Sequence, residues 1–181
     1  SLDRVGRSGA HFDERRLKWV SGAVIRSLDT QDLYERCRTF WPQETADYPE
    51  EYQRQVLSLV QERLKYFSEL PELTRFFFAD LPLDPELITH NKQLKKYETS
   101  DLKSMLTSSR SALADADWDA ESLQTTLNQL LETTGQKPGI LFSLIRIAVT
   151  QSPASPGLAE TLAVLGKERS LKRLDTQLAS L

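Results

Sequence analysis

Residues 138–150 have the sequence Pro-Gly-Ile-Leu-Phe-Ser-Leu-Ile-Arg-Ile-Ala-Val-Thr. Counted from Ile140 at 100° per residue, the polar residues Ser143, Arg146 and Thr150 fall at about 300°, 240° and 280°. A narrow polar seam on an otherwise apolar helix predicts a helix in the core of its subdomain. The pattern leaves two roles open for Arg146, which is either a core-edge residue satisfied by carbonyls and acids or a contact to a phosphate group.

The rest of the chain has a similar helical pattern. Asp84-Pro85-Glu86 places a capping residue and a proline where a helix begins, and Asp117-Trp118-Asp119 supplies another start. No stretch sustains the alternation of apolar and polar residues that a strand requires. The sequence therefore predicts an all-α fold, with helices at residues 13–27 (capped by Asp13), 30–40, 49–67, 70–78, 85–91, 94–114, 118–134, 138–150, 157–165 and 167–180.

Composition predicts a packed globular protein that does not cross a membrane. Hydrophobic residues make up 39% of the 181 residues and charged residues 27%, and the apolar runs are too short for a membrane span. Cys37 is the single cysteine, so no internal disulfide can form and we expect a cytoplasmic location. The chain begins at Ser1 without a methionine, which suggests a processed chain or an excised fragment.

Charge is unevenly distributed along the chain. Residues 1–28 carry 6 Lys and Arg against 3 Asp and Glu, and residues 135–181 also carry 6 against 3. Acids outnumber bases between them, which gives a net charge of −3. Such a chain could hold a polyanion at selected basic patches, but uniform non-specific binding to nucleic acid is not indicated.

The residues that catalysis or metal binding usually require are nearly absent. His11, His90 and Cys37 show no spacing typical of a zinc site or a Cys-His dyad. The turn at residues 6–9 lacks the lysine and hydroxyl pair of a phosphate-binding loop. The acids between residues 115 and 121 are better explained as a solvated helix cap than as a catalytic pair.

Arg63 is the most informative charged residue. In a helix over residues 49–67 it falls at about 340° from Val56, inside the arc of the apolar residues. An arginine on such a face extends past the helix end, pairs with a buried acid, or projects toward a ligand. The planar fork of its guanidinium suits the last role, because it can both hydrogen-bond and stack on a nucleic-acid base.

Both ends of the chain carry a family resemblance. Residues 1–13, Ser-Leu-Asp-Arg-Val-Gly-Arg-Ser-Gly-Ala-His-Phe-Asp, followed by Leu17-Lys-Trp19, resemble the segment that follows the class I catalytic core in bacterial glutamyl-tRNA synthetases. Gly135-Gln-Lys-Pro-Gly139 and Leu162-Ala-Val-Leu-Gly-Lys-Glu-Arg169 are similar to the closing signature of that family. The resemblance spans essentially the whole chain.

The resemblance implies an anticodon-binding region without the catalytic core. Residues 1–28 would end the region that contacts the tRNA stem, and residues 29–93 and 94–181 would form two packed helical subdomains. The two ATP-binding signatures of the family do not occur in the sequence. We therefore expect no catalytic residue, metal or cofactor here, with ATP and magnesium needed only by the catalytic part of a full-length glutamate–tRNA ligase. The fragment alone should be inactive.

The resemblance also implies which residues bind RNA. Arg63 aligns with an arginine that reads the third anticodon base in glutamate-specific members. Arg146 is a further candidate, as is Asn128, at a position that can be basic in the family. The basic ends are expected to contact the RNA backbone through Arg7, Lys137 and Arg169. Two departures concern Leu144, where the family usually has proline, and Gln151, where glycine is common.

The implied partner is glutamate tRNA, bound by a monomer, with no role for DNA or a membrane. The pattern leaves open whether the enzyme is glutamate-specific or also charges glutamine tRNA. The competing hypothesis is a helical protein-interaction or adaptor module with no RNA role. Binding that weakens steeply with salt and requires the cognate tRNA would distinguish the first from the second.

Overall fold

The computed structural model describes residues 14–181, with side chains from Ser21 onward, and this part of the chain contains helices and loops but no strand. The prediction of an all-α fold is confirmed. Arg7 and the cap predicted at Asp13 lie outside the described residues. The α-helices are α1 (Glu14–Ser27), α2 (Thr30–Cys37), α3 (Glu50–Val60), α4 (Leu70–Phe78), α5 (Glu86–Thr89), α6 (Thr99–Asp115), α7 (Ala120–Thr134), α8 (Pro138–Thr150), α9 (Leu158–Leu165) and α10 (Lys167–Ser180).

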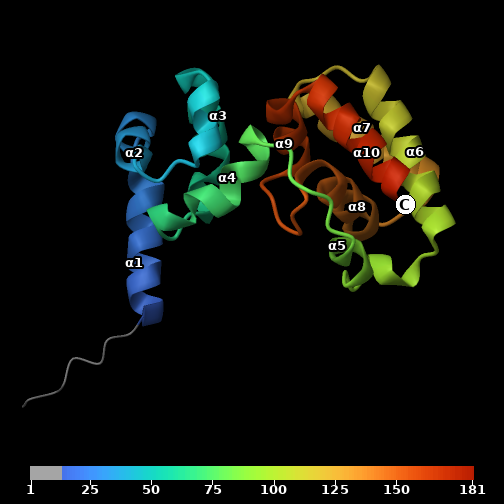
Figure 1. Cartoon of the computed structure of the whole chain (residues 1–181), viewed down its shortest axis with the longest axis horizontal. Coiled ribbons are helices and arrows are strands. Elements are labelled where there is room, and N and C mark those ends of the chain that lie inside the picture. The colour runs from blue at the N-terminus through green and yellow to red at the C-terminus, as the bar shows by residue number, and fades with distance from the viewer. Residues whose placement is uncertain (1–13) are drawn as a thin grey trace, which may run out of the picture.

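The helices form two groups (Figure 1). We call α1–α4 the first group, α5–α10 the second group, and the non-helical residues 79–85 between them the passage. Four 3-10 helices fill the connections, namely η1 (Gln43–Asp47), η2 (Gln61–Arg63), η3 (Phe67–Glu69) and η4 (Leu94–Lys96).

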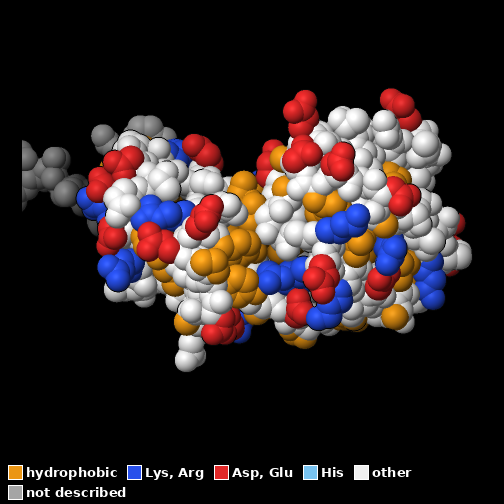
Figure 2. All heavy atoms as spheres, turned by 90° about the horizontal axis from the view of Figure 1, so that it is seen from above, with side chains coloured by type: hydrophobic (Ala, Val, Ile, Leu, Met, Phe, Trp, Pro, Cys, Tyr) orange, Lys and Arg blue, Asp and Glu red, His pale blue; other side chains and the backbone are white. Residues whose placement is uncertain are grey.

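The two groups share one hydrophobic core. Leu57 of α3, Phe77 of α4 and Leu162 of α9 are completely buried members of a single cluster of apolar side chains. Helix α3 packs against α9 across the junction. On the face shown in Figure 2, hydrophobic side chains gather where the groups meet, and acidic and basic side chains are intermingled on both sides. The groups are therefore joined by burial of apolar surface as well as by the chain.

Helix α8 lies in the core of the second group, as its sequence pattern predicts. Leu141, Leu144 and Ile145 are completely buried, and α8 packs against α6 and α10. Truncating such a leucine to alanine typically costs about 2–5 kcal/mol of stability. The burial of α8 therefore contributes strongly to the stability of the second group.

Local signals fix the ends of α7. Asp119 caps its N-terminus, where the carboxylate accepts a 2.9 Å hydrogen bond from the backbone N–H of Ser122. This hydrogen bonding lowers the pKa of Asp119. Gly135 ends the helix with a left-handed φ of 65°, which glycine adopts without steric cost. The cap role predicted for the acids near residue 119 is confirmed for Asp119.

The contacts of α5 bear on the division between the groups. Helix α5 packs against α8, and η4 packs against both α5 and α8. A boundary at residue 93 would separate α5 from the helices it contacts. We therefore propose that the division falls within the passage. The helix predicted over residues 94–114 is also corrected, because η4 and an extended Glu98 precede α6.

Candidate nucleic-acid interface

Arg63 lies at the end of η2, in the first group. Gln61 connects this turn to the end of α1, because its side-chain Nε2 donates hydrogen bonds to the carbonyls of Ile25 (3.0 Å) and Leu28 (2.9 Å). The next residue, Leu64, is completely buried. Arg63 itself is exposed, and among the described residues no carboxylate lies within 4 Å of its guanidinium. The described part of the chain thus offers no buried acid to pair with it.

The predicted orientation of Arg63 was wrong, although its isolation from acids agrees with a ligand role. The helical wheel assumed one α-helix over residues 49–67, whereas α3 ends at Val60 and continues as a 3-10 turn. A 3-10 turn advances about 120° per residue. Three such steps return Arg63 to the angle of Val60, so the change of helix type does not by itself account for its exposure. After Arg63 the backbone becomes extended, and the next side chain, Leu64, is the one that is buried.

Arg146 lies on α8, in the second group, and is half-buried. Its Nε donates a 2.8 Å hydrogen bond to the hydroxyl of Ser155, which in turn donates to the carbonyl of Pro156 at 3.0 Å. Among the described residues this is the one hydrogen bond that the Arg146 side chain donates, and no carboxylate lies within 4 Å of its guanidinium. Ser155 orients the guanidinium and leaves the two terminal nitrogens for another partner.

The two arginines act on one another electrostatically. Burial lowers the pKa of Arg146, and the positive charge of Arg63 lowers it further. The charge of a guanidinium in one helical group thus acts on a guanidinium in the other, and in the described chain no carboxylate lies within 4 Å of either. A phosphate or the acceptor edge of a base would stabilise both charges.

The loop after α8 contributes further polar groups, of which the sequence analysis singled out Thr150 but missed Ser152 and Ser155. The Thr150 hydroxyl lies 2.7 Å from the carbonyl oxygen of Arg146 and 3.2 Å from that of Ser152, so its single proton can be donated to either, and it accepts a hydrogen bond from the N–H of Ser152. Ser152 also donates to the carbonyl of Ala154 at 2.8 Å. The signal was the run of hydroxyl residues between Thr150 and Pro156. These hydrogen bonds within the loop keep Ser155 within hydrogen-bonding distance of the Arg146 guanidinium.

Arg169 is placed differently from the prediction. Its terminal nitrogens donate hydrogen bonds to the carbonyl of Phe77 and the hydroxyl of Tyr48, both at 2.5 Å, and its guanidinium carbon lies 5.3 Å from the centre of the Tyr48 ring. These partners belong to the first group, whereas Arg169 belongs to α10. The contacts give Arg169 a role in joining the groups, and they compete with the predicted contact to RNA.

Lys137 and Asn128 are exposed on the second group, and neither forms a hydrogen bond with Arg63 or Arg146. Lys137 is the residue before α8, about 13 Å along the helix axis from Arg146. The side-chain oxygen of Asn128 accepts a 3.0 Å hydrogen bond from Gln124 on the same helix. Among the predicted residues that the structure describes, the link found is the effect of the Arg63 charge on the pKa of Arg146, which burial lowers first.

For metal binding and thiol catalysis, the described part of the chain shows no site. No group of three or more His, Cys, Asp or Glu residues from residue 14 onward could hold a metal ion. Burial raises the pKa of the Cys37 thiol to about 11, so this thiol is neutral and unreactive. Over the same residues, no helix is long and apolar enough to cross a membrane.

Comparisons with known proteins agree with this geometry. A family model described as an anticodon binding domain matches residues 32–178, so the chain belongs to the anticodon-binding domain family. Two of its relatives are the glutamate–tRNA ligases of Chloroflexus aurantiacus and Roseiflexus castenholzii, with 32% and 35% identity over the whole chain. The chain covers only 37% and 36% of their lengths. The resemblance to glutamyl-tRNA synthetases is confirmed.

Solved structures show the same fold. A glutamate–tRNA ligase from Elizabethkingia meningosepticum, solved in complex with its amino acid, matches 94% of this chain with a TM-score of 0.74 and 16% identity. The glutamate–tRNA synthetase of Elizabethkingia anophelis matches 93% with a TM-score of 0.70 and 17% identity. The chain corresponds to about a third of each of those proteins.

Proposed function

We propose that this chain is the anticodon-reading region of a glutamate–tRNA ligase, and that it binds glutamate tRNA between its two helical groups. The observation that carries the proposal is the pair formed by Arg63 and Arg146. They come from different groups, lie within electrostatic range, and have no carboxylate within 4 Å among the described residues. The family match gives such a pair a polyanionic partner.

Each arginine suits a different part of an anticodon loop. The exposed guanidinium of Arg63 can offer two parallel N–H donors to a base that is splayed out of the loop, as the resemblance implies for cytosine at the third anticodon position. Arg146 is half-buried and held by Ser155, so its terminal nitrogens have a fixed direction. A guanidinium with a fixed direction can position a phosphate or a base edge in one orientation, in addition to attracting it by charge.

The remaining parts of the proposal concern the whole ligase. We propose that the chain acts as a monomer in the cytoplasm, where the ligase joins glutamate to tRNA with ATP and magnesium. The chain alone should not form glutamyl-adenylate, because the ATP-binding signatures of the family do not occur in its sequence. Glutamate-dependent pyrophosphate exchange above background would contradict this.

The test is a titration of the chain with transcribed glutamate tRNA at two ionic strengths. The matched RNA carries guanine in place of cytosine at the third anticodon position, and glutamine tRNA is the control. We expect binding that weakens steeply with salt and prefers cytosine. Association with a protein that is insensitive to salt, together with no preference among the RNAs, would instead favour the adaptor hypothesis.

A further inference from the structure

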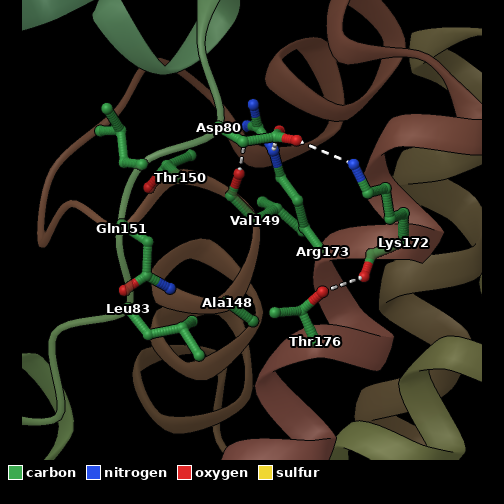
Figure 3. A pocket seen from close by; sticks show the side chains of 10 residues that line it. Asp80, Leu83, Ala148, Val149, Thr150, Gln151, Lys172, Arg173 and Thr176 are labelled. Carbon is green, nitrogen blue, oxygen red and sulfur yellow. Dashed lines mark hydrogen bonds and ion pairs between the residues drawn. The ribbon is translucent and has the colours of Figure 1, made fainter.

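An extensive set of hydrogen bonds ties the second group to the passage. Arg173 of α10 is only 9% exposed and donates three hydrogen bonds there. Its Nε reaches the Asp80 carboxylate at 3.0 Å, Nη2 the Ala79 carbonyl at 2.9 Å, and Nη1 the Val149 carbonyl at 2.7 Å. Figure 3 shows Asp80 between Arg173 and Lys172, whose Nζ donates to the other carboxylate oxygen at 3.0 Å.

The start of the passage is held from both sides. The Phe77 carbonyl belongs to the last turn of α4, where carbonyls have no partner within the helix. It accepts hydrogen bonds from Arg169 of the second group and from the Tyr52 hydroxyl of the first, the latter at 3.1 Å. A cation at this helix end is further favoured by the helix dipole. Arg169 and Arg173 thus hold three residues of one short stretch, Phe77, Ala79 and Asp80.

The other end of the passage is held by Gln151. The side-chain oxygen of Gln151 accepts a 2.9 Å hydrogen bond from the backbone N–H of Asp84. The side-chain nitrogen of Gln151 donates to the carbonyl of Ile147 and to the side-chain oxygen of Gln177, each at 3.0 Å. Gln151 adopts a left-handed φ of 49°, which favours glycine. The side chain supplies contacts with α8, α10 and the passage that a glycine could not make.

Apolar contact alone would hold the groups together without fixing their relative position, since hydrophobic attraction is non-directional. Hydrogen bonds that involve charged groups are directional and comparatively strong. We propose that Asp80 and Arg173 are positioning residues, which fix the spacing between Arg63 on one group and Arg146 on the other before RNA arrives. This inference rests on the proposed function, because spacing matters only if both groups contact the same RNA.

The test measures spacing and recognition in one set of variants. Spin labels are placed at Ser58→Cys on α3 and Ser108→Cys on α6, which are both exposed positions. The buried Cys37 stays unlabelled. Asp80→Ala removes the carboxylate that accepts hydrogen bonds from Nε of Arg173 and Nζ of Lys172. The matched control, Asp175→Ala, removes the acceptor of Arg110, a 2.9 Å ion pair that joins α6 to α10 within the second group.

Asp80→Ala should broaden the distribution of distances between the labels, and Asp80→Glu should narrow it again. If about a fifth of the molecules keep the fitting spacing, the apparent affinity for glutamate tRNA falls about fivefold. Asp175→Ala should change neither quantity. Should Asp80→Ala fail to fold by circular dichroism, Asp80→Asn takes its place; it preserves the side-chain volume and replaces the charged acceptor with a neutral one, so it should broaden the distribution to a smaller extent.

Equally narrow distributions for the Asp80 and Asp175 variants would overturn the proposal, as would a broadened distribution with unchanged affinity for glutamate tRNA. A parent chain that binds no tRNA would contradict the proposed function and the positioning role together. The distance measurement contains no RNA, so the two failures are distinguishable.

Discussion

Arg63, at the end of η2, and Arg169, in the first turn of α10, were both predicted to contact RNA. At η2, Arg63 is exposed and has no carboxylate within 4 Å among the described residues. On α10, Arg169 and Arg173 donate to carbonyls, a hydroxyl and a carboxylate of the first group and the passage. The charge of a segment therefore does not say whether it is available to a ligand. The carbonyls and acids that fold against it determine that.

The largest expected effect is a loss of stability when Arg173, whose guanidinium is hydrogen-bonded within the protein, is removed. Arg173→Ala leaves the carbonyls of Ala79 and Val149 without their donor, so we expect the free energy of unfolding to fall by about 3 kcal/mol. Urea denaturation measures it. The control Arg63→Ala should change stability by less than about 0.5 kcal/mol. If Arg173→Ala and Arg63→Ala lost equal free energies of unfolding, the two arginines would not differ in their contribution to the fold.

The second effect concerns specificity at Arg63. Arg63→Gln should preserve the fold and reduce the preference for cytosine over guanine at the third anticodon position by about 2 kcal/mol, because a forked pair of donors is lost. Affinities for the two RNAs measure it, with Arg38→Gln, an exposed arginine paired with Glu35, as control. If the melting temperature falls while the ratio of affinities stays constant, Arg63 has a structural role.

A third, smaller effect depends on pH. The hydrogen bond from Lys172 and that from Arg173 hold the pKa of Asp80 below its ordinary value. A carboxyl whose pKa is lower when folded stabilises the protein above its unfolded pKa, near 3.9, and the contribution is lost as the pH falls through the folded value. The half-exposed carboxylate should contribute about 1 kcal/mol. Unfolding of the parent and Asp80→Asn at neutral and acid pH should show a difference that disappears in acid.

The smallest expected effect distinguishes a phosphate contact from a packing residue. Lys137→Ala should reduce the slope of log affinity against log salt by about 0.7–0.9. Arg169→Gln should leave that slope unchanged, because its guanidinium is engaged by Phe77 and Tyr48. A reduced slope for Arg169→Gln would instead support the RNA contact predicted from the sequence.

Local chemistry made much of the fold predictable. The cap at Asp119, the left-handed Gly135 and the apolar face of α8 each depend on residues close in sequence, and each element lies within a few residues of its predicted place. The end of α3 was not predictable in the same way. Gln61 leaves the α-helical pattern where its side chain caps α1, a helix that lies more than thirty residues earlier.

The candidate site was only partly predictable for a related reason. Arg63 and Arg146 could be selected individually, but their proximity depends on how the two groups pack. Ser155 was missed as the partner of Arg146 because it is nine residues away and beyond the end of the helix. Arg169 was assigned to RNA because nothing in the sequence near it shows that Phe77 and Tyr48, about a hundred residues earlier, would receive its hydrogen bonds.

The backbone amide of Asp84 offers a natural reporter of the junction. It lies between Pro82 and Pro85, in an exposed segment whose neighbouring prolines carry no exchangeable N–H. Its hydrogen is protected by Gln151, which is itself steadied by Gln177 of α10. Deuterium should therefore enter at this amide only when the segment separates from α8 and α10. The exchange rate of one hydrogen would follow the opening of the junction in the unlabelled, unmodified chain, with and without RNA.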